Sequence, residues 1–283
     1  MILLTGDVHH MSLKTKDQQY MPCTEMEAAV RYARIARQNG LKVTLFITGK
    51  SAIEEPTLLR VLANMENVCL GGHNFYAFHP KWLYKILNHL FCTKNGPSFL
   101  QEWEIRKTKD VFYSLCGVRI DSWRDHGYRQ DKNTYRLLLR NKITYISDDV
   151  GPEFSGPYEV QPGQFSIPIN VLPDHDHLVH GSFTTTIQKN NPKRRSLFDK
   201  GLYSAKEWLE LVKTQVTEIV RQGNVATLLV HPACMMILDD FFTFMKLCKF
   251  LQDFESEFID TSVTKYVQIR RQAYLRKYII RND

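Results

Sequence analysis

The first ten residues, MILLTGDVHH (1–10), place a run of apolar and small residues directly before an aspartate and two histidines. The segment up to Val8 has the composition of a buried strand. Asp7, His9 and His10 are costly to bury without partners, so their position at a strand end needs a chemical reason. Side chains alternate along a strand, which puts Asp7 and His9 on the same face. This stretch therefore predicts a sheet whose strand ends carry a functional site.

The rest of the chain alternates between strand and helix patterns. We expect strands at 42–49, 67–72, 118–123, 142–147 and 224–231, with a further extended segment at 257–262. We expect helices at 24–40, 54–65, 80–91, 98–117, 131–141, 204–222 and 237–253. In the first of these, Thr24 and Glu27 have the spacing of a capping box and Gly40 can end the helix.

This alternation is typical of a parallel sheet or barrel, and we expect one α/β domain of about seven strands. Residues 1–262 would form the barrel, with a loop-rich insertion rich in Pro and Gly at about 150–200. Residues 263–283 would form a basic helical tail that packs on the same domain or extends from it.

Composition and charge narrow the class of protein. The 283 residues are 43% hydrophobic and carry a formal net charge of +7, and their basic residues concentrate at 189–200 and 265–281. These clusters would bind phosphates or would simply be solvated surfaces. A nucleic-acid binder is disfavoured because the charge is modest and aromatic residues are not interleaved with the basic ones.

Cellular location is predicted from what the sequence lacks. None of the six cysteines falls in a C-x-x-C pair, and the first apolar run is too short for a secretory signal. No stretch is apolar for the ~18 residues that a bilayer-spanning helix needs. We expect a cytoplasmic protein with at most peripheral contact, through its tail, with the inner membrane surface.

Ionisable residues gather at the expected strand ends, where parallel barrels place their chemistry. The clusters are Asp7 to His10, His73 with His79, Arg124 to His126, Asp148 with Asp149, and His231. Imidazoles with a carboxylate are the ligands of a catalytic divalent metal, Zn²⁺ above all, which takes three protein ligands and one water. His9 and His73 can meet if their strands are neighbours. The third ligand stays open among His79, His10 and Asp7, because His10 and His79 could equally be surface histidines.

Other motifs are weaker. FITGKS (46–51) contains the Gly-Lys-Ser of a phosphate loop, but the required earlier glycine is Thr44, which argues against nucleotide binding. The G-x-S-x-G motif of serine hydrolases is missing. Cys234 follows His231 by three positions and could be a thiol nucleophile, although an inert buried cysteine is the simpler interpretation.

The order of these motifs resembles that of the polysaccharide deacetylase (NodB-homology, carbohydrate esterase 4-like) family, over most of the chain. The segments that carry the resemblance are LTGDVH (4–9), TLFITGKSA (44–52), GGHNFYAFHP (71–80), WRDHGY (123–128), YISDDVGPEFSGPYEVQPGQFSIPINVLPDHDHL (145–178) and LLVHPA (228–233). The long segment is similar to family branches that include lipid-linked aminoarabinose deformylases and cyclic-amide hydrolases.

The resemblance implies a distorted (β/α)₇ barrel that removes an acyl group from an N-acylated sugar with the help of a divalent metal. The implied catalytic residues are Asp7 as general base, His231 as general acid and Arg124 as the residue that orients Asp7. The implied metal ligands are His9, His73 and His79. Trp123, Tyr128, His126 and Asp149 would contact the substrate.

This chain departs from the family pattern at three points. His9 replaces the metal-binding carboxylate, the two histidines of the second motif are six residues apart instead of four, and Asp125-His126 stands where prolines are common. The first change allows a site of three histidines, a set that holds zinc and activates water. The second change weakens the assignment of His79.

The function expected from these residues is removal of an N-acyl group, acetyl first of all, from a saccharide. A lipid-linked saccharide of surface polysaccharide or lipopolysaccharide biosynthesis would fit the basic segments. Two alternatives stay open, a metal-independent cyclic-amide hydrolase of the same fold and a non-catalytic glycan-binding homologue. Keeping an acid, a base and an arginine together argues against the last, because binding alone needs none of them.

Overall fold

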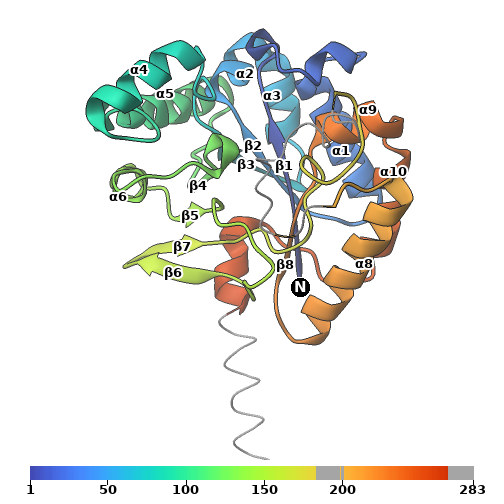
Figure 1. The fold of residues 1–283 in the computed structure, drawn as a ribbon. Helices are drawn as coiled ribbons and strands as arrows, with labels where there is room; N and C mark the ends of the chain where they lie inside the picture. Colours follow the sequence, from blue (N-terminus) through green and yellow to red (C-terminus); the bar gives the residue numbers. More distant parts are fainter. Residues whose placement is uncertain (183–197, 199–200, 267–283) are drawn as a thin grey trace, which may run out of the picture.

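We describe residues 1–182, 198 and 201–266 of a computed structural model. Its centre is an eight-stranded sheet in the order β6-β7-β5-β4-β3-β2-β1-β8, curled into a half-barrel with helices around it (Figure 1). The strands are β1 (Ile2–Val8), β2 (Val43–Ile47), β3 (Val68–Gly72), β4 (Ser122–Trp123), β5 (Tyr145–Ile146), β6 (Tyr158–Gln161), β7 (Gln164–Ser166) and β8 (Ala226–Leu229). All neighbours pair in parallel except the β6–β7 hairpin. The expected α/β barrel architecture is confirmed.

The helices that connect the strands cover the outer face of the sheet (Figure 1). They are α1 (Glu25–Gln38), α2 (Gly49–Glu54), α3 (Pro56–Ala63), α4 (Lys81–Phe91), α5 (Ser98–Cys116), α6 (Thr134–Arg140), α8 (Ala205–Arg221), α9 (Pro232–Asp239) and α10 (Phe242–Leu251). The capping box of α1 forms as predicted between Thr24 and Glu27, and Gly40 follows the helix with φ 67°. No helix among these described residues is both long and apolar enough to cross a lipid bilayer.

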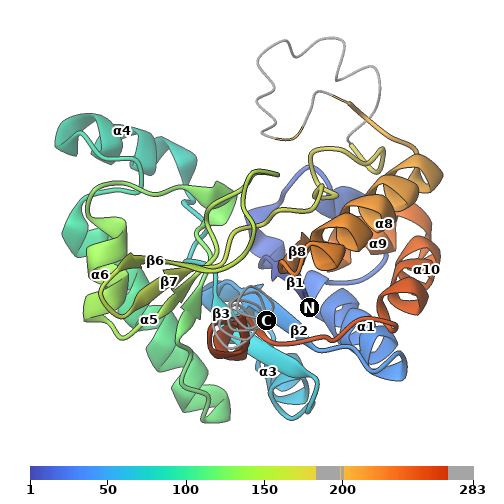
Figure 2. The ribbon, with the colours of Figure 1, turned by 90° about the horizontal axis from the view of Figure 1, so that it is seen from below.

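β1 lies between β2 and β8 and divides its side chains between two apolar layers. Ile2, Leu4 and Val8 belong to the large core under the helices, whereas Leu3 belongs to a smaller core inside the curl. This smaller core also contains Phe46, Ile259 and other residues of the helix at 259–266, which lies below the curled sheet in Figure 1 and in front of it in Figure 2. Strand alternation therefore directs Leu3, Thr5 and Asp7 into the barrel, and the helix fills the end opposite to Asp7.

The chain after β7 bridges the gap between the two edges of the sheet. The amides of Asn170 and Val171 donate to the Thr227 carbonyl at 3.3 Å, and the Asn170 side chain donates to the Val225 carbonyl at 2.8 Å. This bridge brings the segment that follows, from Leu172 to Ser182, against the carboxyl end of β8. A stretch predicted as an insertion thus helps to close the barrel.

Three details differ from the sequence-based expectations. The helix predicted at 237–253 is two helices, because Asp240 and Phe241 adopt left-handed backbone conformations with φ of 52° and 71°. The segment 257–262, predicted to be extended, instead leads into the helix at 259–266. The expected strand at 118–123 is reduced to β4. The basic segment 189–200 lies outside the described residues apart from Phe198, as does the tail beyond 266.

Gly72, at the end of β3, allows the close approach of Trp123. A Cβ at Gly72 would lie 2.2 and 2.3 Å from two Trp123 ring atoms, and this indole is fully buried. We expect Gly72→Ala to lower the free energy of unfolding by about 1–3 kcal/mol through overpacking. Urea denaturation would measure this against Leu90→Ala, which removes an exposed side chain of α4 and should change stability by less than about 0.5 kcal/mol. Equal stability of the two variants would contradict the close packing described here.

Candidate active site

Asp7 is the last inward-facing residue of β1 and is paired with a buried arginine. Its Oδ1 accepts a hydrogen bond from Nη1 of Arg124 at 2.8 Å. The Asp7 side chain is 5% exposed and that of Arg124 is fully buried. Burial alone would raise the pKa of Asp7, but the charge of Arg124, with smaller contributions from His73 and His231, holds it well below its usual range. Asp7 is therefore an ionised base at neutral pH.

Arg124 is fixed by the barrel interior on every side. Its Nε donates to the Ser147 carbonyl at 3.0 Å, and its Nη2 donates to the hydroxyls of Ser147 and Thr5 at 2.7 and 3.0 Å. The guanidinium also lies over the Phe46 ring, 4.3 Å from its centroid. A charge-assisted network of this kind is strong and directional, so the Asp7 carboxylate has little freedom to turn.

His231 lies opposite Asp7 and carries its own carboxylate partner. Its Nδ1 is 2.7 Å from Oδ1 of Asp174, whose Oδ2 accepts the His231 backbone amide at 2.7 Å. The other ring nitrogen, Nε2, is 3.7 Å from Oδ2 of Asp7. Burial lowers the pKa of His231, but the charge and hydrogen bond of Asp174 outweigh it and raise the pKa to about 9. His231 is thus an imidazolium, an acid facing a base.

Three imidazoles gather on the other side of Asp7. His9, His73 and His126 each offer a ring nitrogen, and these atoms all lie within 4.8 Å of one another. The Nε2 atoms of His9 and His73 are 3.2 Å apart, close to the ~3.3 Å that separates two nitrogen ligands of a tetrahedral zinc ion. Nε2 of His73 is also 3.8 Å from Oδ2 of Asp7.

Hydrogen bonds at the outer nitrogens determine which ring nitrogens face this centre. Nδ1 of His73 lies 2.7 Å from the Arg124 carbonyl, and Nδ1 of His9 lies 3.1 Å from the Glu25 carboxylate. Both partners are acceptors, so both Nδ1 atoms carry the proton and both Nε2 lone pairs point at each other. Burial lowers the pKa of His73 to about 4, so a second proton on His73 does not relieve the contact. A cation between the rings would, and the donor set fits a divalent metal.

Asn74 and Asp125 place His126 beside the other two histidines. Asn74 Oδ1 accepts the His126 backbone amide at 2.7 Å, and its Nδ2 donates to Asp125 at 2.8 Å. The Trp123 indole donates to the same Asp125 oxygen at 3.1 Å. Trp123 is fully buried, which corrects the expectation that it lines a sugar-binding wall. His126, expected to contact substrate, lines the cavity beside Asp7 and also belongs to the imidazole cluster.

His79 does not join this cluster. The backbone is left-handed at Ala77 and Phe78, with φ of 49° and 58°, and the Phe78 ring takes the inward position, 6.2 Å from His126. His79 is exposed and lines a separate apolar pocket with Trp103. The chain between His73 and His79 therefore turns away from the site, and His126 lies beside His9 and His73 where His79 was expected.

His10 also points elsewhere. It is buried, and its Nδ1 lies 3.2 Å from the Thr48 hydroxyl, at the start of α2. Strand alternation explains this, because His10 faces the side of the sheet opposite to Asp7 and His9.

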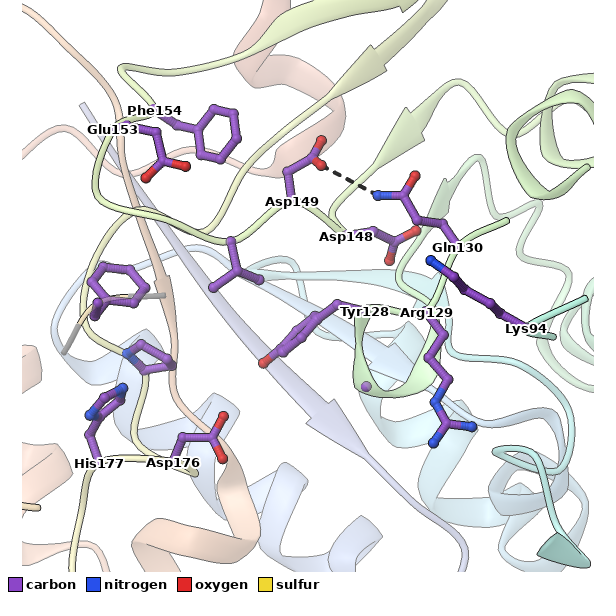
Figure 3. Close-up of a pocket in the computed structure, with 14 residues that line it drawn as sticks. Lys94, Tyr128, Arg129, Gln130, Asp148, Asp149, Glu153, Phe154, Asp176 and His177 are labelled. Atoms are coloured by element: carbon purple, nitrogen blue, oxygen red, sulfur yellow. Dashed lines mark hydrogen bonds between the residues drawn. The ribbon is translucent and has the colours of Figure 1, made fainter. Parts of the chain in front are cut away.

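Two adjoining cavities open onto these groups. The first, about 660 Å³, is lined by Asp7, His9, His126 and His231, and the second, about 580 Å³, is lined by Asp149 and Phe154 among others. Gly127, Tyr128 and Asp176 line both cavities. Figure 3 shows the second cavity, in which the Tyr128 side chain lies between Asp176 on one side and Asp148 and Gln130 on the other.

Asp149, expected to contact substrate, is held by protein groups in this second cavity. Its Oδ2 accepts hydrogen bonds from Tyr158 at 2.7 Å and from the Ser166 hydroxyl, and its Oδ1 accepts one from Gln130 (Figure 3). A substrate group would therefore meet Asp149 only in competition with these partners.

Sequence reasoning missed three residues that orient the functional groups. Asp174 lies within the quoted segment LPDHDHL, where a carboxylate among histidines was a signal. Glu25 is the first residue of α1 and was taken only as part of the helix. Asn74 directly follows His73. Each acts through a contact between distant segments, which a single sequence does not reveal.

Comparisons with known proteins bear on the fold. No protein-family model and no curated protein matches the sequence. Many solved structures resemble the fold, among them three at 12–14% identity. A Mycobacterium smegmatis protein described as a polysaccharide deacetylase has a TM-score of 0.68 at 14% identity, over 96% of this chain and 90% of its own. A Pseudomonas aeruginosa PAO1 protein with the same description has a TM-score of 0.61 at 12% identity, over 93% of this chain and 77% of its own. The allantoinase PuuE has a TM-score of 0.60 at 13% identity, over 92% of this chain and 76% of its own. The chain thus has the NodB-like barrel fold of the polysaccharide deacetylases.

The cluster makes a testable distinction between two histidines. We expect His126→Ala to reduce the zinc bound per chain by one equivalent, because it removes one of three ligands. His79→Ala should leave zinc binding unchanged. Metal analysis after dialysis against a weak chelator would measure both. Loss of zinc in the His79 variant alone would instead support His79 as the third metal ligand, as the sequence resemblance implies.

The Asp174–His231 pair predicts a pH dependence of stability. The pKa of His231 is about 9 in the folded protein and about 6.5 when unfolded, so the pair stabilises fully below pH 6.5 and this stabilisation is lost as pH rises through 9. We expect the stability difference between the wild type and Asp174→Asn to shrink over this window. Urea denaturation of both proteins at several pH values would measure this difference. NMR titration of the His231 ring would show directly that its pKa is lower in Asp174→Asn than in the wild type. A difference that does not change with pH would contradict the pairing.

Proposed function

We propose that this protein is a metal-dependent hydrolase that removes an N-acyl group, acetyl first of all, from a saccharide. The observation that carries the proposal is the arrangement around Asp7. An ionised carboxylate faces an imidazolium at 3.7 Å, and three imidazoles whose ring nitrogens lie within 4.8 Å of one another are beside them. General acid–base hydrolysis of an amide uses a base and an acid, and metal assistance needs a set of ligands such as the three imidazoles.

His9, His73 and His126 would hold the metal, with Zn²⁺ the ion that a set of three imidazoles favours. When bound, the ion polarises the amide carbonyl and lowers the pKa of water. Glu25 and the Arg124 carbonyl keep the inner nitrogens of His9 and His73 unprotonated and aimed at the centre. This second layer of contacts supports metal affinity as well as ring orientation.

Asp7 and His231 would divide the proton transfers between them. Asp7 accepts the proton of the attacking water, because Arg124 keeps the carboxylate ionised and turned toward the cavity. His231 donates a proton to the departing amine nitrogen, because Asp174 holds the ring protonated at neutral pH. The two pKa values move in opposite directions, as acid and base roles require.

The two cavities support a substrate longer than a single sugar. The acylated unit would lie in the cavity beside Asp7, and neighbouring units would pass Tyr128 into the cavity lined by Phe154, Arg129 and Gln130. Aromatic and mixed polar side chains of this kind suit saccharides. A lipid-linked saccharide of surface polysaccharide biosynthesis, handled at the inner membrane surface, is the more specific form of this proposal.

Metal content separates this function from the alternatives. A metal-independent cyclic-amide hydrolase would need no ion between His9 and His73, where two lone pairs face each other at 3.2 Å. A glycan-binding homologue would have no use for the opposed charges of Asp7 and His231. Acetate release from N-acetylated oligosaccharides by zinc-loaded protein, and its absence from chelator-treated protein, would support the hydrolase.

Replacing Asp7 tests the base directly. Asp7→Asn should keep the bound zinc yet lower turnover by about 100-fold or more, the range of general base catalysis. Asp110→Asn, an exposed substitution on α5, should leave turnover unchanged. Circular dichroism and zinc content would verify that the Asp7 variant is folded, since it leaves Arg124 buried without its counter-ion. Wild-type turnover in Asp7→Asn would remove Asp7 from the mechanism.

A further inference from the structure

A second group of metal-binding side chains lies beside Asp174, apart from the three imidazoles described above. His175, His180 and Cys234 each offer one ligand atom, and these atoms all lie within 4.8 Å of one another. The two histidines belong to the segment DHDHLVH (174–180), and Cys234 belongs to the first turn of α9. The proposed hydrolase mechanism uses none of the three.

The distances and orientations suit a single cation. Nδ1 of His175 is 3.9 Å from Sγ of Cys234, near the ~3.5 Å expected between a nitrogen and a sulfur ligand of tetrahedral zinc. Nδ1 of His180 lies 2.8 Å from the Leu178 carbonyl and so carries its proton, which leaves Nε2 as the coordinating nitrogen.

Asp17, which lies outside this group of three, approaches His180 from a third segment of the chain and would become a fourth ligand if a bound ion drew it closer. Its Oδ2 is 3.9 Å from Nε2 of His180. Its other oxygen, Oδ1, accepts hydrogen bonds from the Ser182 amide at 3.0 Å and the Ser182 hydroxyl at 2.6 Å. The carboxylate is therefore oriented with one oxygen toward the protein and the other toward His180, in the way that ligating carboxylates are held.

A competing group shares the cysteine. The ligand atoms of Asp174, His231 and Cys234 also lie within 4.8 Å of one another. Both oxygens of Asp174, however, already accept hydrogen bonds, from the ring and amide of His231 and from the amide of His175. A cation there would break the contact that keeps His231 protonated, so the histidine pair is the better partner for Cys234.

We propose that His175, His180, Cys234 and Asp17 form a second divalent metal site with one thiolate ligand, and that the ion it takes is Zn²⁺. Two imidazoles, a thiolate and a carboxylate are a ligand set that zinc prefers over Mg²⁺ or Ca²⁺, which favour oxygen. The site goes beyond the proposed hydrolase function and does not depend on it. Four protein ligands leave no open position, so the ion is structural.

This ion would tie together three segments that border the catalytic cavity. They are the turn around Asp17, the segment 174–180 and the start of α9, which follows His231 directly. Asp17, His175 and Cys234 line the same 660 Å³ cavity as Asp7 and His231. Because Asp174 precedes His175, the ion would also fix the carboxylate that holds the acid.

Cobalt substitution tests the thiolate ligand without any measurement of activity. The metal-free full-length protein would be titrated with Co²⁺, whose thiolate complexes absorb in the near-ultraviolet by charge transfer, unlike complexes of imidazole and carboxylate alone. We expect this absorption in the wild type and its loss in Cys234→Ser, which should bind one equivalent of cobalt fewer. His180→Asn should lose the same equivalent.

Two matched controls keep the result specific. Cys248→Ser removes another buried thiol, on α10, and His177→Asn removes another histidine of the same segment; both should retain the absorption. His73→Ala should also retain it, because that histidine belongs to the other cluster. The proposal is overturned if folded wild-type protein shows no charge-transfer absorption, or if Cys234→Ser retains it. Neither result would bear on the hydrolase proposal.

Discussion

The architecture of the site depends on one buried ion pair, between Arg124 and Asp7. A guanidinium with no exposure inside a barrel is stable only if its donors are satisfied, and here Thr5 and Asp7 of β1 and Ser147 after β5 accept hydrogen bonds from it. Removing one partner of such a pair generally costs about 3–5 kcal/mol, because the other charge stays buried alone. The same contact that holds the interior together thus fixes the direction of the proposed base.

Outer hydrogen bonds determine what each histidine of the cavity can do. A backbone carbonyl on His73 and a carboxylate on His9 leave the inner nitrogens as lone-pair donors, suited to a cation. His231 also has a carboxylate at Nδ1, that of Asp174, but its Nε2 faces the Asp7 carboxylate, so the charged form of the ring is stabilised. His9 and His231 therefore differ in what Nε2 meets, which is another imidazole for His9 and a carboxylate for His231. Histidines of identical chemistry are therefore suited to hold a metal or to act as an acid according to the contacts on both sides of the ring.

The two proposed metal positions and the acid–base pair share one cavity, and His231 contacts both neighbourhoods. Its Nε2 lies 3.7 Å from Oδ2 of Asp7. Its ring is tilted against that of His175, with ring centroids 5.3 Å apart. Burial lowers the pKa of His126 and His175 in this cavity, whereas the charge and hydrogen bond of Asp174 keep the pKa of His231 raised. The segment 174–180, which the barrel bridge brings against β8, thus supplies both the orienting carboxylate and the second ligand group.

The sequence by itself determined the alternation of strands and helices, the capping of α1 and the gathering of ionisable residues at strand ends, because these follow from local periodicity and composition. It also placed Asp7, His9, His73, Arg124 and His231 at strand ends. Only the tertiary structure placed His126, and not His79, beside His9 and His73, since the left-handed turn at Ala77 and Phe78 and the Asn74 bridge involve no pattern of spacing. It alone revealed Asp174, Glu25 and the cluster around Cys234, because each joins segments whose proximity is set by how the sheet curls.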